Sequence, residues 1–381
     1  MISFELAKIF KRIIVISKLF SPIEIRGLVI PNRVFYSPMC EYSCDTDGLP
    51  TDWHMVHLGS KAIGGAGIVM AEATAVTPEG RLTSSCPGIW SDAHVDAWRP
   101  ITKFIDSHGS IPAIQIAHGG RKASYTRPWD FPKKKLEKEE GGWQIVGPSS
   151  VQFDDSYAVP HELSKPDITD ISRKFAEAAE RAIEAGFKVI ELHFAHGYLA
   201  SSFMSPLSNY REDEYGGSLE NRCRFALETI QEVRKAISES TPLFVRISSV
   251  EFVEGGWTID DSIKLAKWMK KAGVDLVDAS GGGNSANQIV PQSPGYQVPF
   301  ADAIRREAEI MTAAVGLITE ARQAEDILTE GRADAVFIGR EMMRNPYWPL
   351  YAQAQLDGKS DQWPIQYERS SFDATYAGPK A

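Results

Sequence analysis

The sequence predicts an α/β fold in which eight parallel strands close into a single barrel surrounded by helices. One pattern recurs along the chain: an amphipathic helix, a glycine or polar break, and a short apolar strand that ends in polar residues. The strands are apolar almost throughout, as a parallel sheet buried on both faces requires. With 381 residues the chain can hold eight such units in one domain, so the prediction is a single (β/α)8 TIM barrel.

Eight segments carry the strand pattern, in chain order. They are residues 33–39, 63–76, 107–120, 184–197, 240–248, 271–283, 310–318 and 330–340. Helical segments such as 171–186 and 262–273 lie between them, with apolar residues at i, i+3 and i+4 and a final glycine typical of a helix C-terminus. A doubly wound open sheet is the alternative, but no GxGxxG follows the first strand, and the barrel is therefore favoured.

The connection after the third strand, from His118 to Asp167, is long. Its charged run, residues 133–140, is interpreted as a solvated tip. Residues 142–154 are expected to form a hairpin that caps part of the barrel. Long loops in compact domains are often functional lids, so this extended third loop is the expected cover of the barrel mouth.

The expected organisation is one domain with two flanking segments: an N-terminal extension at 1–18, the barrel at 19–369 and a C-terminal tail at 370–381. The extension mixes basic and apolar residues, lacks a long apolar core and carries Glu5. An amphipathic helix is therefore favoured over a targeting peptide. No apolar run reaches the roughly 20 residues that are needed to span a bilayer.

Composition disfavours several classes of function. Lys and Arg number 41 against 50 Asp and Glu, a net charge of −9, which argues against general binding to nucleic acids or anionic membranes. The four cysteines form no CxxC pair and no zinc spacing, so a disulfide framework or structural metal is not expected. A reducing, cytoplasmic location fits this cysteine usage.

Active sites of such barrels lie at the carboxyl ends of the strands, so the residues there are the candidates for function. These ends carry Ser37, Pro38, Met39, Cys40, Ala73, Gln115, His118, His193, His196, Arg246, Ser280, Gly316, Gly339 and Arg340. Backbone N–H groups around the last glycines, with the Arg340 guanidinium, would suit a phosphomonoester. Glycines that merely close tight turns are the alternative.

The densest group of reactive side chains is in ELHFAHGYL, residues 191–199, at the end of the fourth strand. Two imidazoles, His193 and His196, precede the phenol of Tyr198. Such a group can donate hydrogen bonds to a substrate oxygen and supply a proton. Together with Glu191, the histidine pair could instead hold a metal ion, as in a metal-dependent hydrolase or lyase. Two purely structural histidines are a third interpretation.

Several segments together resemble the old yellow enzyme family of FMN-dependent ene-reductases. They are NRVFYSPMCEYS, IQIAHGGRKA, ELHFAHGYLASSFMSPLSNYREDEYGGSLENRCRF, GLIT and FIGR, and the similarity runs from Leu19 to Arg369. The PMCEY segment, with Cys40, resembles the thermophilic-like and xenobiotic reductase subgroup. Larger relatives that act on dienoyl thioesters or amines add an iron–sulfur cluster, which four scattered cysteines argue against here.

The resemblance implies that FMN binds tightly and non-covalently across the barrel mouth, with NADPH or NADH as reductant. The residues implied in cofactor binding are Ser37, Pro38, Met39, Cys40 and Ala73 at the ring system, Gln115 and Arg246 at the pyrimidine end, and Gly316, Gly339 and Arg340 at the phosphate. Reduced flavin carries negative charge near its pyrimidine ring, so a fixed guanidinium there favours reduction.

The resemblance also implies a reaction. His193 and His196 would bind the oxygen of an activated alkene, such as an enone, enal, maleimide or nitroalkene. Flavin N5 would deliver a hydride, and Tyr198 would protonate the opposite face. Reductant and alkene would bind in turn, in a ping-pong cycle. Tyr42 would offer a hydroxyl to the substrate, and Arg369 would enter the neighbouring subunit's site in a homodimer or homotetramer.

Overall fold

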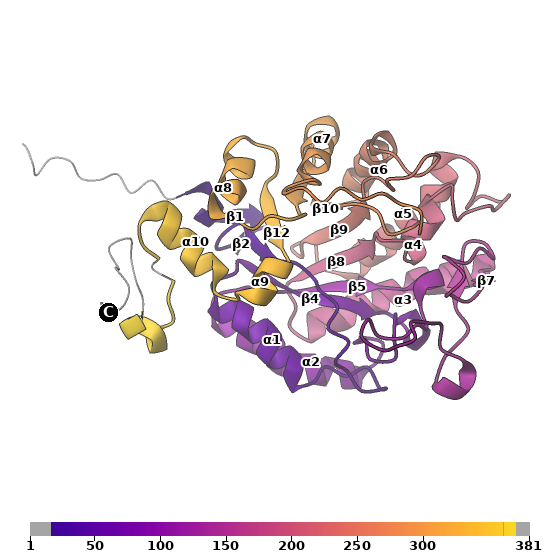
Figure 1. Cartoon of the computed structure of the whole chain (residues 1–381), viewed down its shortest axis with the longest axis horizontal. Coiled ribbons are helices and arrows are strands. Elements are labelled where there is room, and N and C mark those ends of the chain that lie inside the picture. The colour runs from indigo at the N-terminus through magenta and orange to yellow at the C-terminus, as the bar shows by residue number, and fades with distance from the viewer. Residues whose placement is uncertain (1–16, 361, 371–381) are drawn as a thin grey trace, which may run out of the picture.

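The computed structural model describes residues 17–360 and 362–370, except the side chains of 368–370. Eight parallel strands form a closed barrel in the order β3-β4-β5-β8-β9-β10-β11-β12, which β12 closes against β3 (Figure 1). The strands are β3 (Val34–Tyr36), β4 (Ile68–Ala75), β5 (Ile111–Ala117), β8 (Val189–Phe194), β9 (Leu243–Ser248), β10 (Leu276–Ser280), β11 (Met311–Ala314) and β12 (Ala335–Ile338). Each strand lies in one of the eight predicted segments, so the TIM barrel is confirmed.

Helices cover the outside of the barrel, with α1 and α2 on one side of the strands in Figure 1 and α6 and α7 on the other. They are α1 (Asp52–Ile63), α2 (Asp92–Ser107), α3 (Lys165–Glu184), α5 (Leu219–Ala236), α6 (Ile259–Lys271), α7 (Val298–Ala308) and α8 (Ala321–Thr329), with the shorter α4 (Leu199–Met204), α9 (Arg340–Arg344) and α10 (Trp348–Asp357). Local capping sets where several begin. At α3, Ser164 and Asp167 form a reciprocal capping box, so the helix starts before its amphipathic segment.

An antiparallel hairpin, β1 (Ile23–Ile25) with β2 (Leu28–Ile30), precedes the barrel. Its turn residues Arg26 and Gly27 have φ of +51° and +81°, the left-handed pair that a two-residue hairpin turn favours. Its buried isoleucines join the apolar cluster inside the barrel, so the hairpin closes the amino-terminal end of the strands. This hairpin was not among the elements predicted from the sequence.

The barrel interior changes character from one end to the other. Near the hairpin it is filled by apolar side chains, including Phe35, Phe244 and Phe337. One strand layer further on, the inward residues are polar and buried: Gln115, Glu191, Arg246 and Asp278. The strand register brings these together, because Gln115 is paired with Glu191, and Arg246 with Asp278. The polar layer thus forms the floor beneath the carboxyl ends of the strands.

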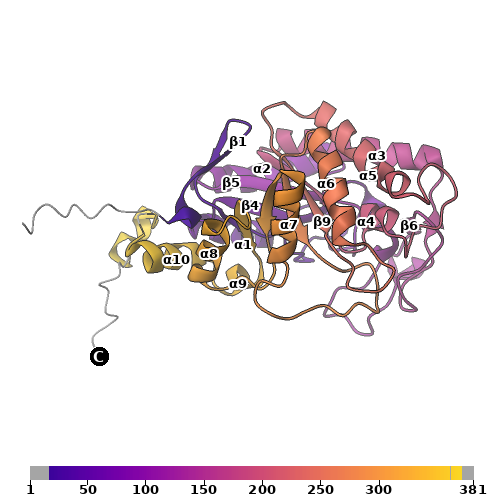
Figure 2. The same cartoon turned by 90° about the horizontal axis from the view of Figure 1, so that it is seen from above.

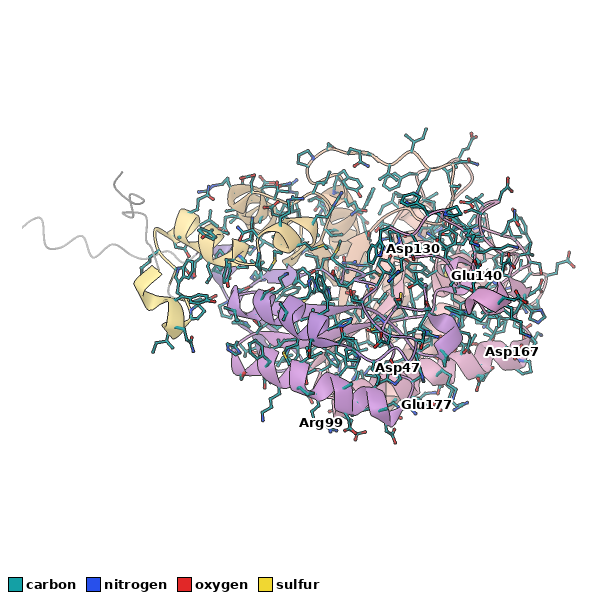
Figure 3. The ribbon with its side chains drawn as sticks, turned by 60° about the horizontal axis from the view of Figure 1, so that its bottom comes forward. Asp47, Arg99, Asp130, Glu140, Asp167 and Glu177 are labelled. Carbon is teal, nitrogen blue, oxygen red and sulfur yellow. The ribbon has the colours of Figure 1, made fainter. Side chains whose placement is uncertain are left out.

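The extended third loop is present, but its expected hairpin is wrong. Two short strands, β6 (Val146–Gly147) and β7 (His161–Glu162), pair in parallel instead of forming a hairpin over 142–154. Pro148 follows β6 directly and has no N–H with which to continue a strand ladder. The chain therefore leaves β6 and returns to pair with it only at β7. The charged run is largely exposed, as predicted; Asp130 and Glu140 mark this loop in Figure 3.

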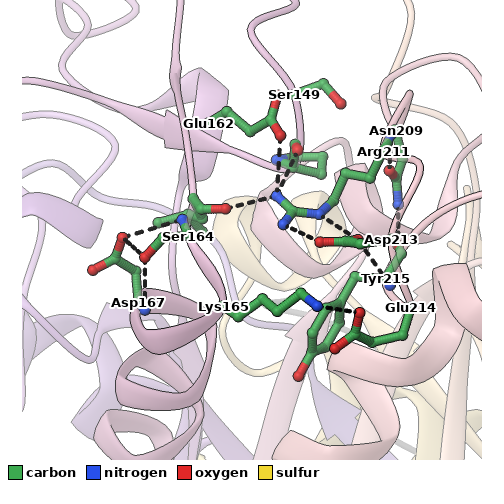
Figure 4. Close-up of polar contacts among 12 residues, drawn as sticks. Ser149, Glu162, Ser164, Lys165, Asp167, Asn209, Arg211, Asp213, Glu214 and Tyr215 are labelled. Carbon is green, nitrogen blue, oxygen red and sulfur yellow. Dashed lines mark hydrogen bonds and ion pairs between the residues drawn. The ribbon is translucent and has the colours of Figure 1, made fainter.

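Arg211 holds the third loop onto the barrel (Figure 4). Its guanidinium donates to the carbonyls of Pro148 and Leu163, at 3.1 and 2.6 Å, and pairs with Asp213 at 2.6 Å. The SNYREDEYGGS stretch of the sequence therefore contributes a structural anchor. It fixes the segment that carries β6 and β7 beside α3.

The two flanking segments fall mostly outside the described residues. The helix expected in the N-terminal extension would lie in residues 1–16, and the C-terminal tail begins at residue 370, so neither expectation is tested. Figure 2 places α10 at one end of the molecule and β6 toward the other. Among the described residues, none of the helices is long and apolar enough to cross a membrane.

Candidate active site

Arg246 is the centre of the polar floor. Its guanidinium donates to Ser37 Oγ at 2.9 Å and pairs with Asp278 Oδ2 at 2.5 Å. Glu191 Oε1 lies 3.9 Å from Arg246 Nε and accepts a hydrogen bond from Gln115 Nε2 at 2.8 Å. Two predicted flavin residues, Gln115 and Arg246, are thus in contact with the acidic side chains of Glu191 and Asp278, which were not predicted to belong to the flavin site.

The floor holds two buried carboxylates for one arginine. Glu191 Oε2 and Asp278 Oδ1 have no hydrogen-bond partner among the described residues. Burial raises the pKa of both acids, and the charge of Asp278 raises that of Glu191 further, to about 8. The raised pKa favours the protonated form of Glu191, and Asp278, 2.5 Å from the guanidinium, is the closer acidic partner of Arg246. The signal for this pair, inward-facing acids on neighbouring strands, appears only once the register is known.

His193, His196 and Tyr198 converge above this floor. The ring centroids are 5.1 Å apart for the two histidines, 4.9 Å for His193 and Tyr198, and 6.4 Å for His196 and Tyr198. The planes are nearly perpendicular, at 85° to 89°. The close grouping that the sequence predicted is present in the structure.

Hydrogen bonds orient both imidazoles. His193 Nδ1 accepts from the backbone N–H of Ala195 at 3.4 Å, which leaves the proton on Nε2. The backbone of His196 has φ of +62°, and its backbone N–H donates to Ser248 Oγ at 2.8 Å. Its Nε2 lies 2.8 Å from Ser280 Oγ. The two serines were not given roles by the sequence analysis, although Ser280 was noted at a strand end.

Burial keeps the three side chains uncharged. It lowers the pKa of His193 well below its usual value and that of His196 to about 3, with Arg246 adding to both shifts. Burial also raises the pKa of Tyr198 well above its usual value, as does the nearby Cys40. The site therefore presents neutral imidazoles and a protonated phenol at neutral pH.

A cavity opens beside Arg246 and is lined by residues predicted to bind the cofactor: Ser37, Met39, Arg246, Gly316, Gly339 and Arg340. Gly316 is favoured by its positive φ, whereas at Gly339 an added Cβ would meet the movable end of one side chain. An added Cβ would lie 2.8 Å from Gln297 Nε2 at Gly316, where φ is +112°, and 2.8 Å from Met39 Sδ at Gly339. Pro38, two residues after β3, and Ala73, in β4, are buried but do not line this cavity. The cavity therefore fits a flat ring system with a phosphate at its glycine end.

A second cavity lies between Tyr198 and the third loop. Tyr42 lines it and contacts Trp129 edge-to-face, with ring centroids 5.7 Å apart, and its predicted role beside the substrate stays a prediction. Cys40 is half-buried, and burial together with Glu72 raises the pKa of its thiol. The Arg369 side chain lies outside the described residues, so its placement in a neighbouring site is untested.

The metal interpretation gains no support from the geometry. Among the described residues there is no group of three or more His, Cys, Asp and Glu side chains arranged to hold a metal ion. Glu191 instead contacts Gln115 and faces Arg246. A metal-dependent hydrolase or lyase on the histidine pair would need a third ligand that this site does not provide.

Comparison with known proteins identifies close relatives. A model of the NADH:flavin oxidoreductase / NADH oxidase family matches residues 18–359. The chain is 48% identical over 356 residues to an NADPH dehydrogenase of Geobacillus sp. (strain WCH70), covering 92% of this chain and 98% of that protein. It is 46% identical to the NADPH dehydrogenase of Bacillus subtilis (strain 168), covering 92% and 98%.

Two solved structures are also similar to this chain. Morphinone reductase in complex with tetrahydroNAD superimposes with a TM-score of 0.74 at 26% identity, covering 88% of this chain and 90% of that one. The old yellow enzyme homologue from Zymomonas mobilis superimposes with a TM-score of 0.74 at 25% identity, covering 93% and 98%.

Proposed function

The chain belongs to the NADH:flavin oxidoreductase / NADH oxidase family, and we propose that it is an ene-reductase of activated alkenes. It is a flavin oxidoreductase that uses FMN, with NAD(P)H as reductant. The observation that carries this proposal is the convergence of His193, His196 and Tyr198 over the floor held by Arg246. Enones, enals, maleimides and nitroalkenes all present an oxygen that two N–H donors can bind. Bound FMN supplies the hydride, from N5.

The histidines bind and polarise the substrate oxygen. His193 carries its proton on Nε2, as its Ala195 contact requires. His196 Nε2 lies 2.8 Å from Ser280 Oγ, and when the serine hydroxyl donates to this nitrogen the proton of His196 is on Nδ1. Each neutral imidazole then offers one donor to the oxygen on which charge develops. Tyr198 protonates the adjacent carbon from the opposite face, with net trans addition.

The floor and the glycine cavity hold the cofactor. Arg246 is fixed by Ser37 and Asp278, so its positive charge stays beside the pyrimidine ring, where reduction adds negative charge. Gly316, Gly339 and Arg340 bind the phosphate, with backbone N–H groups and a guanidinium. Gln115, Met39, Pro38, Cys40 and Ala73 complete the contacts with the ring.

We further propose that the active enzyme is a homodimer or homotetramer in which Arg369 completes the neighbouring site. The C-terminal part of the chain exposes large apolar side chains that a second copy would cover: Met343, Tyr351, Ile365 and Tyr367. Ile365 is 80% exposed and lies four residues before Arg369. The four free cysteines support a cytoplasmic location.

The test is a visible absorption spectrum of the purified enzyme, followed by anaerobic addition of NADPH and then cyclohexenone. We expect flavin bands that bleach with NADPH and return with the enone. Flavin that bleaches and stays bleached with enones, enals and nitroalkenes alike would refute the ene-reductase assignment while leaving the family membership intact. NADH in place of NADPH measures the preference for reductant.

A further inference from the structure

Lys122 is a cation placed inside the second cavity, and the proposed mechanism does not use it. It follows β5 in the short 3-10 turn Gly120–Lys122 and lines the cavity together with Tyr198. Its Nζ donates to the carbonyls of His196 and Gly283, at 2.9 and 2.8 Å. An ammonium group has three N–H donors, so one remains for a ligand.

The charge of Lys122 is not neutralised by a carboxylate in contact. No acidic side chain lies within 4.0 Å of its Nζ among the residues that the structure describes. Asp154 is on the wall of the same cavity, but its Oδ1 accepts two hydrogen bonds from Ser156, at 2.8 and 2.6 Å. Burial, with a contribution from Arg121, lowers the pKa of Lys122 to about 7, and the charge of Asp154 offsets only part of this shift.

Other basic residues of the third loop differ from Lys122 in this respect. Three of them form ion pairs within the loop: Arg127 with Asp130, Lys134 with Glu140, and Lys135 with Glu137. Lys133 lines the rim of the second cavity and lies 5.7 Å from the Phe131 ring centroid. The cavity wall thus carries Lys122 and Lys133 against a single acid, Asp154, and favours an anion.

The walls around Lys122 are aromatic and preformed. Tyr125 and Tyr157 stack at 4.1 Å with an interplanar angle of 13°, and Phe153 meets Tyr157 edge-on at 5.2 Å. The Lys122 ammonium lies 4.4 Å from the Phe153 ring centroid and 5.4 Å from that of Tyr198. A flat ring can pack against such a wall without reorganising it.

We propose that the second cavity extends the substrate site and selects activated alkenes that carry an aromatic ring bearing a carboxylate, with the ring against Phe153 and Tyr157 and the carboxylate on Lys122. This inference rests on the proposed ene-reductase function, because Tyr198 belongs both to this cavity and to the proposed catalytic group. A charge-assisted hydrogen bond in a partly buried site fixes the orientation of the alkene as well as its affinity.

The test uses substrates matched in shape and different in charge. The holoenzyme is assayed with 3- and 4-carboxycinnamaldehyde and with the corresponding carboxamides, which are neutral and isosteric. We expect kcat/KM for at least one carboxylate to exceed that of its carboxamide by about tenfold, the size of one charged hydrogen bond. Equal values for both pairs in the natural enzyme would overturn the proposal without any variant.

Variants locate the effect. Lys122→Gln removes the charge but keeps two donors for the carbonyls of His196 and Gly283, and it should bring the ratio of kcat/KM for carboxylate over carboxamide down to about one. Lys122→Arg should retain the preference. Lys134→Met, a matched control, removes one positive charge from the same loop where it pairs with Glu140, and should leave the preference unchanged.

The outcomes separate this inference from the function on which it rests. If neither carboxylates nor carboxamides reoxidise the reduced flavin, the ene-reductase function fails. If the carboxamides are reduced and Lys122→Gln slows both classes equally, Lys122 is only a structural support and the proposed selectivity is wrong.

Discussion

The two ends of the barrel interior differ in polarity: one is apolar and sealed, and the other is polar and open. At the amino-terminal end, the β1–β2 hairpin seals a dry cluster in which Phe35 stacks near Phe244, at 6.4 Å, and meets Phe337 edge-on at 5.4 Å. At the carboxyl end, the same strands carry Arg246 and two acids with unpartnered oxygens. Hydrophobic burial stabilises the first end. At the second end, buried polar groups without a partner lower the stability but are available to a ligand.

This difference predicts whether a substitution at each end should change the stability or the chemistry of the enzyme. A change at the sealed end should lower the free energy of unfolding and leave the flavin chemistry untouched. A change at the open end should alter chemistry or pH dependence with little loss of stability, because other residues form the apolar cluster. Four variants test this separation, in order of decreasing expected effect.

Tyr198→Phe should have the largest effect, confined to chemistry. Without its proton, alkene reduction should slow by about 10²–10⁴-fold, while reduction of the flavin by NADPH is unchanged. Stopped-flow measurement of the two half-reactions separates these steps. Tyr210→Phe, at an exposed tyrosine, is the control. Equal slowing of both half-reactions, or of neither, would remove Tyr198 from the proton-donor role.

Phe35→Ala should have the largest effect on stability. The fully buried ring leaves a cavity that the rigid barrel cannot fill, so the free energy of unfolding should fall by about 3–5 kcal/mol. Urea unfolding of natural and variant protein gives this difference. The flavin spectrum and the rate of alkene reduction of the folded variant should stay the same. A shifted spectrum would show that the two ends are coupled.

Glu191→Gln should change the pH dependence of stability. The folded pKa of Glu191 is raised to about 8, above its unfolded value of about 4.3, so the native state holds one extra proton between these values. The stabilisation is complete below the unfolded pKa and is lost as pH rises toward about 8, by at most about 1.4 kcal/mol per pH unit. Glutamine does not titrate, so this slope should disappear.

Unfolding of the FMN-free protein by urea across about pH 5 to 8 measures that slope for natural and variant chains. Glu254→Gln, at an exposed acid, should leave it as it is. A variant slope equal to that of the natural protein would mean that Glu191 is ionised in the native state and that Arg246 faces two negative charges.

Gly27→Ala should have the smallest effect. An added Cβ meets no atom within 4 Å, so the only cost is the left-handed backbone, φ +81°, which is about 1–2 kcal/mol for a residue with a Cβ. Thermal or urea unfolding should show this loss with unchanged alkene reduction. A loss as large as that of Phe35→Ala would mean that the hairpin detaches as a unit.

The fold was largely predictable because each parallel strand buries both faces and therefore appears as an apolar run on its own. Strand ends such as Arg246 and His193 could be identified for the same reason. The Glu191–Asp278 relation could not, because it depends on which residues of different strands face each other. The β1–β2 hairpin was missed although IEIRGLVI contains its turn glycine, because its strands are only three residues long.

The error in the third loop has a similar cause. Residues 142–154 contain an apolar run followed by polar residues, which is also the pattern of a hairpin. The actual partner of β6 lies beyond that segment, at His161 and Glu162, where Arg211 holds the returning chain. A long-range anchor on another element decided the pairing, and a local pattern does not contain that information. Lys122 was likewise visible only as part of IQIAHGGRKA.

One contact beside the catalytic group has a consequence for how this enzyme can diverge. Gly197 and Gly283 face each other so closely that a Cβ on Gly197 would lie 2.3 Å from the Gly283 carbonyl oxygen, and one on Gly283 would lie 2.4 Å from His196 Cα. Both residues also have positive φ. Neither turn can gain a side chain unless the other retreats, so the two must be inherited, or redesigned, as a matched pair.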